Sequence, residues 1–440
     1  MNTQFDEARA GRITPAMKAA AAAEKQDPAN IRAEISGGRA VLPVNPNHKN
    51  LRPAVIGRDF RTKINANIGL STEQSDCRRE LRKLAIALEA GADFVMDLSV
   101  GPDLSKLRKL MLANCPVPFG TVPIYEAVCR TGGTAESFDP DVLLEVISEQ
   151  ARQGVDFMTL HAGLLKEHIP LALKRRAGIV SRGGAILASW MSRRRKQNPL
   201  YTRWPEVLEI CKAYDVTISL GDGLRPGCLA DASDEAQFAE LDTIGALVRQ
   251  CRKYGVQVMV EGPGHVPFDQ IRMNMEREQK VCNGAPFYVL GPVVTDVCPG
   301  YDHISACIGA TAAATYGAAL LCYVTPAEHL GLPTEEEVRE GIIAFRIAAH
   351  AADVARGLPG ARDWDDAMTK ARVAFDWDKQ FKLALDGRKA KARFQKIAGK
   401  KTKSLDHCSM CGAEFCAMRI SQKIASDGKA AGKNIHRPLR

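Results

Sequence analysis

The feature that most constrains the fold is a pattern that recurs through the middle of the chain. A short apolar run of strand-forming residues ends in a polar or glycine-containing signature, and a stretch with helical periodicity follows it. Strands that alternate with helices predict parallel β/α units, and strands that are apolar throughout predict a sheet buried on both faces. Such runs begin at Lys63, Asp93, Gly120, Asp156, Gly178, Val216, Val256, Phe287 and Leu320.

Roughly eight β/α units over about 270 residues fit a (β/α)8 barrel of the α/β class. The runs outnumber the eight strands of a barrel by one, so one run must be a loop or an extra strand. The run that begins at Phe287 is the candidate for this exception. The alternative is an open doubly wound sheet, which is less favoured because no glycine fingerprint opens a first βα turn.

The pattern divides the chain into three predicted parts. Residues 1–60 look helical and then irregular, and the sequence does not indicate their role. Residues 61–360 are the predicted catalytic barrel, and residues 361–440 are a helical region with a cysteine-containing tail. Near the end of the barrel, Thr334-Glu-Glu-Glu337 predicts the start of a helix with a capping box.

Composition excludes several classes of protein. Met1–Arg12 contains no apolar signal-peptide core, and the longest uncharged apolar run, Ile308–Val324, falls short of a membrane span. Thirteen scattered cysteines in such a chain predict a reducing compartment, so we expect a cytoplasmic protein. Much of the net charge of +9 lies in residues 388–403, where Phe394 is the only aromatic residue. This predicts a solvated connector rather than a nucleic-acid surface, and a basic protein suits anionic small substrates.

The tail places Cys408, Cys411 and Cys416 within nine residues, and no cysteine follows them. Three thiolates leave one iron of a four-iron cluster open, whereas a fully ligated cluster needs four. An open iron is what radical chemistry from S-adenosylmethionine (SAM) requires. His407 is a possible fourth ligand of a closed zinc site instead, so the tail alone leaves zinc and an iron–sulfur cluster as alternatives.

The barrel fold predicts where an active site lies, because active sites of this fold occupy the carboxyl ends of the strands. Two glycine-rich turns with an arginine, at residues 181–184 and 221–225, predict a phosphate site through their backbone N–H groups. The alternative is that they are merely tight turns. The side chains expected at this rim are Asn67, Met96, Tyr125, His161, Ser181, Arg182, Gly183, Asp222, Gly223, Leu224, Arg225, Glu261, His265 and His329.

Other rim residues carry alternative interpretations. His265 and His329 each follow a strand, and we expect them to share a metal whose shell substrate or SAM completes. The alternative is that one of them is a general base or is merely hydrogen-bonded. Asp222 and Glu261 are predicted to hold hydroxyl groups or a ring amine, or else to orient other side chains. Tyr125 and Tyr288 at the rim are candidates for aromatic residues that only pack against their neighbours.

Long motifs in this chain resemble phosphomethylpyrimidine synthase and its paralogue 5-hydroxybenzimidazole synthase. They occur in the same order as in that family and cover essentially residues 60–420. The motifs are Asn65-Ala-Asn-Ile-Gly69, Gly120-Thr-Val-Pro-Ile-Tyr125, Gly178-Ile-Val-Ser-Arg-Gly-Gly184, Ser219-Leu-Gly-Asp-Gly-Leu-Arg-Pro-Gly227, Val260-Glu-Gly-Pro-Gly-His-Val-Pro267, Ala285-Pro-Phe-Tyr288, Pro299-Gly-Tyr-Asp-His303, Cys322-Tyr-Val-Thr-Pro326 and Cys408-Ser-Met-Cys411.

The resemblance implies a radical SAM carbon–carbon lyase with a (β/α)8 barrel that rearranges 5-aminoimidazole ribotide. It implies a [4Fe-4S] cluster on Cys408, Cys411 and Cys416, and a zinc-type metal on His265 and His329. It also implies a homodimer and an electron donor such as flavodoxin or ferredoxin. The implied substrate-binding residues are Asn67, Met96, Tyr125, His161, Ser181, Arg182, Gly183, Asp222, Gly223, Leu224, Arg225, Glu261 and Tyr288.

The chain departs from the pyrimidine-synthase pattern at Leu70, in Ser99-Val-Gly-Pro102, at Ala185 and at Cys298. Three of these departures replace a polar side chain by an apolar one, each a possible loss of about 1 kcal/mol of hydrogen bonding. We therefore expect 5-hydroxybenzimidazole synthase of anaerobic cobamide (vitamin B12) biosynthesis. The alternative is phosphomethylpyrimidine synthase of thiamine biosynthesis. A third hypothesis, an inactive barrel with a zinc tail that only binds, is disfavoured by the intact cysteines and rim.

Overall fold

A computed structural model describes residues 2–71, 76–398, 406–407 and 410–430 of the chain. The chain divides into two compact units, residues 1–358 and 359–440. Residues 1–60 thus share a unit with the barrel, and the three-part division of the chain stays a prediction. No helix in these described ranges is long and apolar enough to cross a membrane.

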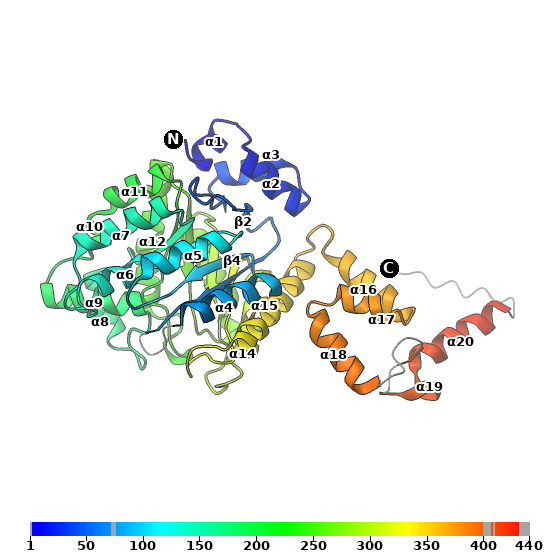
Figure 1. The fold of residues 1–440 in the computed structure, drawn as a ribbon. Coiled ribbons are helices and arrows are strands. Elements are labelled where there is room, and N and C mark those ends of the chain that lie inside the picture. Colours follow the sequence, from blue (N-terminus) through cyan, green and yellow to red (C-terminus); the bar gives the residue numbers. More distant parts are fainter. Residues whose placement is uncertain (1, 72–75, 399–405, 408–409, 431–440) are drawn as a thin grey trace. The chain divides into compact units, whose positions relative to one another are not determined.

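The first unit holds a closed barrel of eight parallel strands (Figure 1). Their order around the barrel is β10-β3-β4-β5-β6-β7-β8-β9, and pairing of Leu320 with Lys63 closes it. The predicted (β/α)8 fold is therefore confirmed, and the open doubly wound sheet is excluded. The strands are β3 (Lys63–Ile68), β4 (Phe94–Asp97), β5 (Phe119–Thr121), β6 (Phe157–Leu160), β7 (Thr217–Leu220), β8 (Val258–Gly262), β9 (Phe287–Leu290) and β10 (Ala318–Cys322).

Helices surround the barrel in Figure 1, and their buried apolar side chains belong to the same cluster as those of the strands. The capping box predicted at Thr334 is present, since its hydroxyl accepts from the amide of Glu337. The helices are α4 (Cys77–Ala90), α5 (Leu104–Asn114), α6 (Pro123–Arg130), α7 (Pro140–Gln153), α8 (Ile169–Ala172), α9 (Arg182–Arg194), α10 (Pro199–Thr202), α11 (Trp204–Ala213), α12 (Glu235–Tyr254), α13 (Ile271–Val281), α14 (Asp302–Thr315) and α15 (Glu335–Ala355).

The ninth candidate strand is not the one that we expected. The run from Phe287 is the barrel strand β9, whereas the run from Gly178 forms no strand. Gly178 has a positive φ of 67°, and Ser181 caps α9 by accepting from the amide of Gly184 at 3.2 Å. The sequence of a short apolar run does not distinguish a strand from the segment that leads into a helix, because length and periodicity are similar in both.

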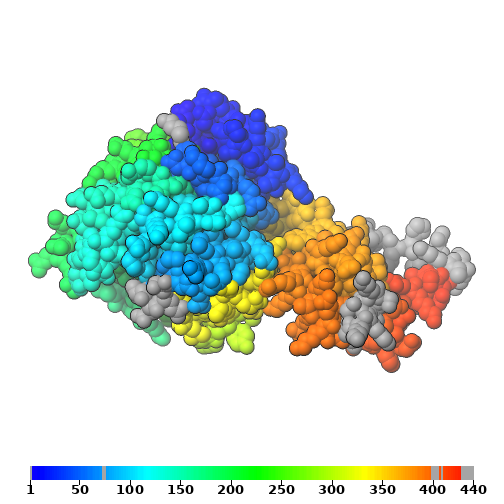
Figure 2. All heavy atoms as spheres, viewed as in Figure 1, coloured from blue at the N-terminus to red at the C-terminus, as the bar shows by residue number. Residues whose placement is uncertain are grey.

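The first sixty residues form a layer with its own apolar cluster, which includes Phe5, Met17 and Ile35. In Figures 1 and 2 this layer is the dark blue region, and it makes one continuous patch of surface. Its elements are α1 (Gln4–Arg9), α2 (Pro15–Glu24), α3 (Pro28–Ser36) and the antiparallel pair β1 (Ala40–Val41) and β2 (Ile56–Gly57).

This layer covers the amino-terminal end of the barrel, opposite the end where an active site is expected. Its backbone amides donate to side chains just before the strands: Leu42 to Gln257 at 2.7 Å and Asn45 to Asp156 at 2.9 Å. Asp156 also binds the His48 ring, with 2.6 Å between Oδ2 and Nδ1, and both side chains are fully buried. The layer therefore closes the bottom of the barrel through buried polar contacts.

The second unit is helical in the part that the structure describes. Trp377 stacks on Phe394 with 4.3 Å between ring centroids, and Phe381 lies against the same ring. Cys411 and Cys416 lie in this unit, whereas Cys408 lies outside the described residues. The helices are α16 (Ala361–Val373), α17 (Trp377–Leu383), α18 (Gly387–Ala398), α19 (Gly412–Phe415) and α20 (Ala417–Ala430).

We predict that Asp156→Ala lowers the free energy of unfolding of the first unit by about 3–5 kcal/mol, because it leaves His48 buried without its carboxylate. The measurement is urea denaturation followed by tryptophan fluorescence. Asp141→Ala is the matched control, since the Asp141 side chain is 78% exposed beside Arg203 and its loss costs less than about 1 kcal/mol. Equal effects of the two substitutions would contradict the account of the buried contact.

Candidate active site

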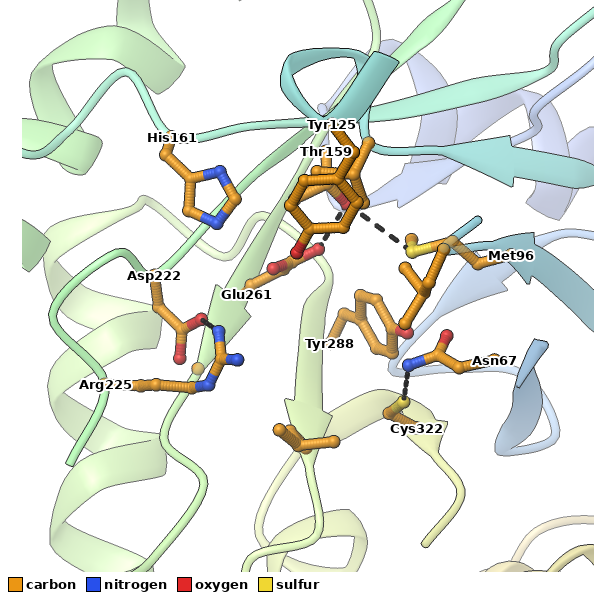
Figure 3. Close-up of a pocket in the computed structure, with 14 residues that line it drawn as sticks. Asn67, Met96, Tyr125, Thr159, His161, Asp222, Arg225, Glu261, Tyr288 and Cys322 are labelled. Atoms are coloured by element: carbon orange, nitrogen blue, oxygen red, sulfur yellow. Dashed lines mark hydrogen bonds and ion pairs between the residues drawn. The ribbon is translucent and has the colours of Figure 1, made fainter. Parts of the chain in front are cut away.

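The carboxyl ends of the strands surround a cavity of about 460 Å³, open solvent included (Figure 3). Side chains from strands far apart in the sequence meet here because barrel closure brings all strand ends to one rim. The cavity is lined by Asn67, Met96, Leu98, Val122, Tyr125, Thr159, His161, Asp222, Arg225, Glu261, Gly262, Tyr288, Leu290 and Cys322.

Many predicted substrate-binding residues reach this cavity, although their role in binding stays a prediction. Those that line it are Asn67, Met96, Tyr125, His161, Asp222, Arg225, Glu261 and Tyr288. Tyr125 does so from the first turn of α6 rather than from a strand end. The remaining predicted residues, Ser181, Arg182, Gly183, Gly223 and Leu224, belong to the two glycine-rich turns beside the cavity.

Glu261 lies near the centre of the site in Figure 3. Its Oε1 accepts hydrogen bonds from the Thr159 hydroxyl at 2.6 Å and from the Ser219 hydroxyl at 2.9 Å. Burial raises the pKa of Glu261, and the two hydroxyl donors oppose that rise. The carboxyl group is thus held in one orientation by neighbouring strands β6 and β7.

Another part of the cavity wall, which begins at the strand next to Glu261, is a chain of amide contacts. The Asn65 amide nitrogen donates to the Tyr288 hydroxyl and to Asn67 Oδ1, each at 2.7 Å. The Asn67 amide nitrogen in turn lies 3.0 Å from Cys322 Sγ. Burial raises the pKa of Cys322 to about 12, so this thiol is protonated at neutral pH. These contacts fix the orientation of both residues that were predicted to bind the substrate here, Asn67 and Tyr288.

Sequence reasoning missed several of these residues, among them Asn65, Thr159 and Cys322. A signal for two of them existed, because alternate residues of a strand point to the same face. Asn65 stands two positions before Asn67, and Thr159 stands two before His161. The position of Cys322 at the last residue of β10 was the corresponding signal for the thiol.

Asp222 and Arg225 form an ion pair at the rim, with 3.3 Å between Oδ1 and Nη1. Burial raises the pKa of Asp222, and the Arg225 guanidinium opposes the rise. The same guanidinium also lowers the pKa of Glu261 against its burial. The Arg225 guanidinium therefore faces the carboxyl groups of both Asp222 and Glu261. Two buried carboxylates beside one cation are stabilised either by protonation or by a ligand that donates hydrogen bonds to them.

His161 is packed between two glycines. A Cβ on Gly183 would lie 2.4 Å from the imidazole ring, and a Cβ on Gly221 would lie 2.9 Å from it. The ring Nε2 lies 3.2 Å from the Ser181 hydroxyl, and burial lowers the pKa of His161 to about 3. Glycine is required on both sides because the ring occupies the space that a side chain would need.

The two glycine-rich turns meet backbone to backbone. A Cβ on Gly184 would lie 2.2 Å from the carbonyl oxygen of Gly223. Ser181 caps α9, and the Arg182 guanidinium lies over the Tyr125 ring at 4.9 Å. The turns are therefore neighbours beside the cavity, which is the arrangement that the predicted phosphate site needs. Phosphate binding itself stays a prediction.

His265 and His329 lie side by side, with 5.3 Å between ring centroids. The Nδ1 of His265 lies 2.9 Å from Asp296 Oδ1, and that of His329 lies 3.3 Å from Asp302 Oδ1. A histidine that donates from Nδ1 to a carboxylate presents Nε2 to a metal. Burial also lowers the pKa of His265, which favours the neutral ring that binds metals.

The pair thus fits a metal with two protein ligands, and the carboxylates of Asp296 and Asp302 were not foreseen. In the part of the chain that the structure describes, no group of three or more His, Cys, Asp or Glu side chains can hold a metal. A metal on His265 and His329 would take its other ligands from water, substrate or SAM. Zinc at this position stays a prediction.

The described cysteines of the tail flank a one-turn helix. Cys411 is exposed and precedes α19, and Cys416 follows it and is 8% exposed. The third predicted ligand, Cys408, lies outside the described residues.

Comparisons with known proteins agree on a family. A profile of the radical SAM ThiC family matches residues 3–423. The phosphomethylpyrimidine synthase of Halobacterium salinarum is 58% identical over 98% of this chain and 90% of its own length. The phosphomethylpyrimidine synthase of Natronomonas pharaonis is 59% identical over 97% of this chain and 90% of its own length. A dihydropteroate synthase from Xanthomonas albilineans, with 12% identity and a TM-score of 0.43, covers 72% of this chain and all of its own; this weak likeness carries no argument.

The prediction that the chain is a 5-hydroxybenzimidazole synthase is wrong, because relatives with 58–59% sequence identity are named phosphomethylpyrimidine synthase. The structure shows why the four departures misled. The lining of the described cavity includes neither Leu70, nor residues 100–102, nor Ala185, nor Cys298. Ala185 is exposed on α9, and the Cys298 thiol lies 3.2 Å from the carbonyl oxygen of Thr295. These four departures are therefore no direct evidence of which product forms in the cavity.

We predict that the His161 ring stays neutral near pH 5, where an ordinary histidine of pKa 6.5 is protonated. Because the pKa is lowered in the folded state, the unfolded chain gains a proton first as pH falls. The contribution of His161 to stability is therefore present above pH 6.5 and is lost as pH falls toward 3. The measurement is nitrogen NMR of histidine-labelled protein, with His161→Gln to assign the signal. Protonation of this ring with a midpoint near 6.5 would contradict the prediction.

Proposed function

The chain belongs to the radical SAM ThiC family, and on that premise we propose that it is a phosphomethylpyrimidine synthase of thiamine biosynthesis. Membership makes it a radical SAM enzyme of the lyase type that uses SAM and an iron–sulfur cluster. The substrate that we propose is 5-aminoimidazole ribotide, and the product is 4-amino-5-hydroxymethyl-2-methylpyrimidine phosphate. The observation that carries the proposal is the identity of 58–59% to synthases of this name over nearly the whole chain.

The cavity at the barrel mouth is the proposed substrate site. When bound, SAM and the cluster supply the radical chemistry, and the protein supplies binding, orientation and exclusion of water. We assign the ribotide phosphate to the two glycine-rich turns and Arg225, and the amine and hydroxyl groups to Asp222 and Glu261. The proposed contact residues are Asn67, Met96, Tyr125, His161, Ser181, Arg182, Gly183, Asp222, Gly223, Leu224, Arg225, Glu261 and Tyr288.

The charge balance of the cavity supports this substrate class. Asp222 and Glu261 share one guanidinium, so a ligand that donates hydrogen bonds from an amine and hydroxyl groups relieves the excess of buried acceptors. The neutral His161 ring offers one donor and one acceptor beside them.

The cluster ligands that we propose are Cys408, Cys411 and Cys416, holding a [4Fe-4S] cluster with one open iron. The support is the set of three thiols together with the family. The proposed second metal is zinc or another divalent ion on His265 and His329, supported by their spacing and their carboxylate partners. A homodimer and an electron donor such as flavodoxin or ferredoxin rest on the family resemblance alone.

We predict that His265→Ala and His329→Ala each lower the affinity for Zn²⁺ by at least about 100-fold, because two protein ligands share the ion. Asp296→Asn removes the carboxylate behind His265 and is expected to cost about 10–100-fold. The measurement is competition with a chromophoric chelator on metal-stripped protein, which needs no catalysis. His350→Ala on α15 is the control. Unchanged zinc affinity in both histidine variants would remove the proposed site.

We predict that the reconstituted protein, given SAM, reductant and 5-aminoimidazole ribotide without oxygen, forms the pyrimidine phosphate, read by mass spectrometry. Cys411→Ser and Cys416→Ser are each expected to abolish the iron–sulfur absorption and the product. Cys77→Ser, on an exposed cysteine of the barrel, is the matched control and is expected to retain both. A hydroxybenzimidazole product, or no turnover of the ribotide by a fully loaded protein, would overturn the proposed function.

A further inference from the structure

Glu240 is a buried glutamate that sequence reasoning did not single out. It lies on α12, one turn into the helix, and is 2% exposed. Its Oε2 accepts a hydrogen bond from the backbone amide of Leu224 at 2.7 Å. Glu240 does not line the cavity at the barrel mouth; it reaches the turn after β7 from behind.

The turn that Glu240 contacts carries the charged pair of the site. Residues 221–225 turn back on themselves, since the Arg225 amide donates to the Asp222 carbonyl oxygen at 3.1 Å. At its middle, a Cβ on Gly223 would lie 3.0 Å from Glu240 Oε1 and 3.3 Å from the Cα of Gly184. Glycine at this position therefore leaves room for the carboxyl group on one side and for the neighbouring turn on the other.

Other side-chain contacts to the backbone of this turn are weaker. The Arg175 guanidinium lies 3.5 Å from the Arg225 carbonyl oxygen, but its short bonds go to Asp234 at 2.6 and 2.7 Å. The contact of Glu240 with Leu224 is shorter and lies between Asp222 and Arg225 in the sequence. It is therefore placed to set the direction in which both charged side chains leave the turn.

We propose that Glu240 is a positioning residue: its carboxyl group fixes the backbone of residues 221–225 and so directs Asp222 and Arg225 into the cavity. This proposal rests on the proposed function for its effect on ribotide binding. Its structural core, the hold on the Leu224 amide, does not depend on which ligand the cavity takes.

We expect the contact between Glu240 and the Leu224 amide to depend on the length of the side chain rather than on its charge. Burial raises the pKa of Glu240 to about 8, and the negative charge of Asp222 adds to the rise, while the backbone amides of Leu224 and Gly223 and, more weakly, Arg175 oppose it. The carboxyl group is thus largely neutral at pH 7, and it accepts through an oxygen that an amide also offers. Glutamine keeps that oxygen in place, whereas aspartate keeps the acid but is shorter by one methylene.

The test compares Glu240→Gln with Glu240→Asp in the full-length protein. Binding of 5-aminoimidazole ribotide is measured by calorimetry, and exchange of the Leu224 amide is measured by hydrogen–deuterium mass spectrometry without ligand. We expect Glu240→Gln to bind within about threefold of the unaltered protein and to keep the amide protected. We expect Glu240→Asp to bind about tenfold or more weakly and to exchange faster. Glu206→Asp on the surface of α11 controls for the shortening itself.

The outcomes separate the possibilities. Loss in Glu240→Gln alone would show that the acid rather than the length of the side chain matters, and a protected Leu224 amide in Glu240→Asp would show that Glu240 does not hold the turn; either result would overturn the proposal. So would normal binding and a protected amide in both variants. If Glu240→Asp does not fold, Glu240→Gln decides, since weaker binding together with faster exchange of the Leu224 amide in that variant would overturn the proposal. If the unaltered protein does not bind the ribotide, the proposed function fails, while amide exchange still decides the role of Glu240.

Discussion

Closure of the parallel barrel is the constraint on which the rest of the structure depends. Strand β10 pairs with β3, with Cys322 opposite Asn65, so the last strand of the barrel meets the first at the rim. All eight carboxyl ends then surround one cavity, and residues from Asn67 to Cys322 share it. The other end of the barrel is sealed by the N-terminal layer, whose buried contact between His48 and Asp156 leaves one open mouth.

Within that mouth, burial decides the chemistry more than any single contact does. Arg225 faces the carboxyl groups of both Asp222 and Glu261, and burial raises the pKa of both acids. The same burial lowers the pKa of His161 and keeps its ring neutral. Such a site has acceptors in excess, so it favours a ligand rich in donors and suits proton transfer near neutral pH. Radical chemistry also benefits from a shaped cavity that positions the substrate, which the barrel supplies.

The sequence was sufficient for the barrel, because alternating strands and helices are a strong pattern, and for many cavity residues, because strand ends converge. The predictions for the runs at Phe287 and Gly178 were wrong, because the sequence of a short apolar segment does not distinguish a strand from a loop. The sequence did not foresee Glu240, whose contact with Leu224 joins a helix to a distant turn. The product was predicted wrongly because substitutions such as Ala185 were taken as a sign of a changed product, whereas these positions are not part of the cavity lining.

The most direct test of the central claim is a crystal structure of the protein with 5-aminoimidazole ribotide bound. The account predicts the ribotide in the cavity at the barrel mouth, with its phosphate at the two glycine-rich turns and its amine or hydroxyl groups on Asp222 and Glu261. Ribotide bound at another place, or bound in the cavity with its phosphate away from both turns and Arg225, would contradict the account.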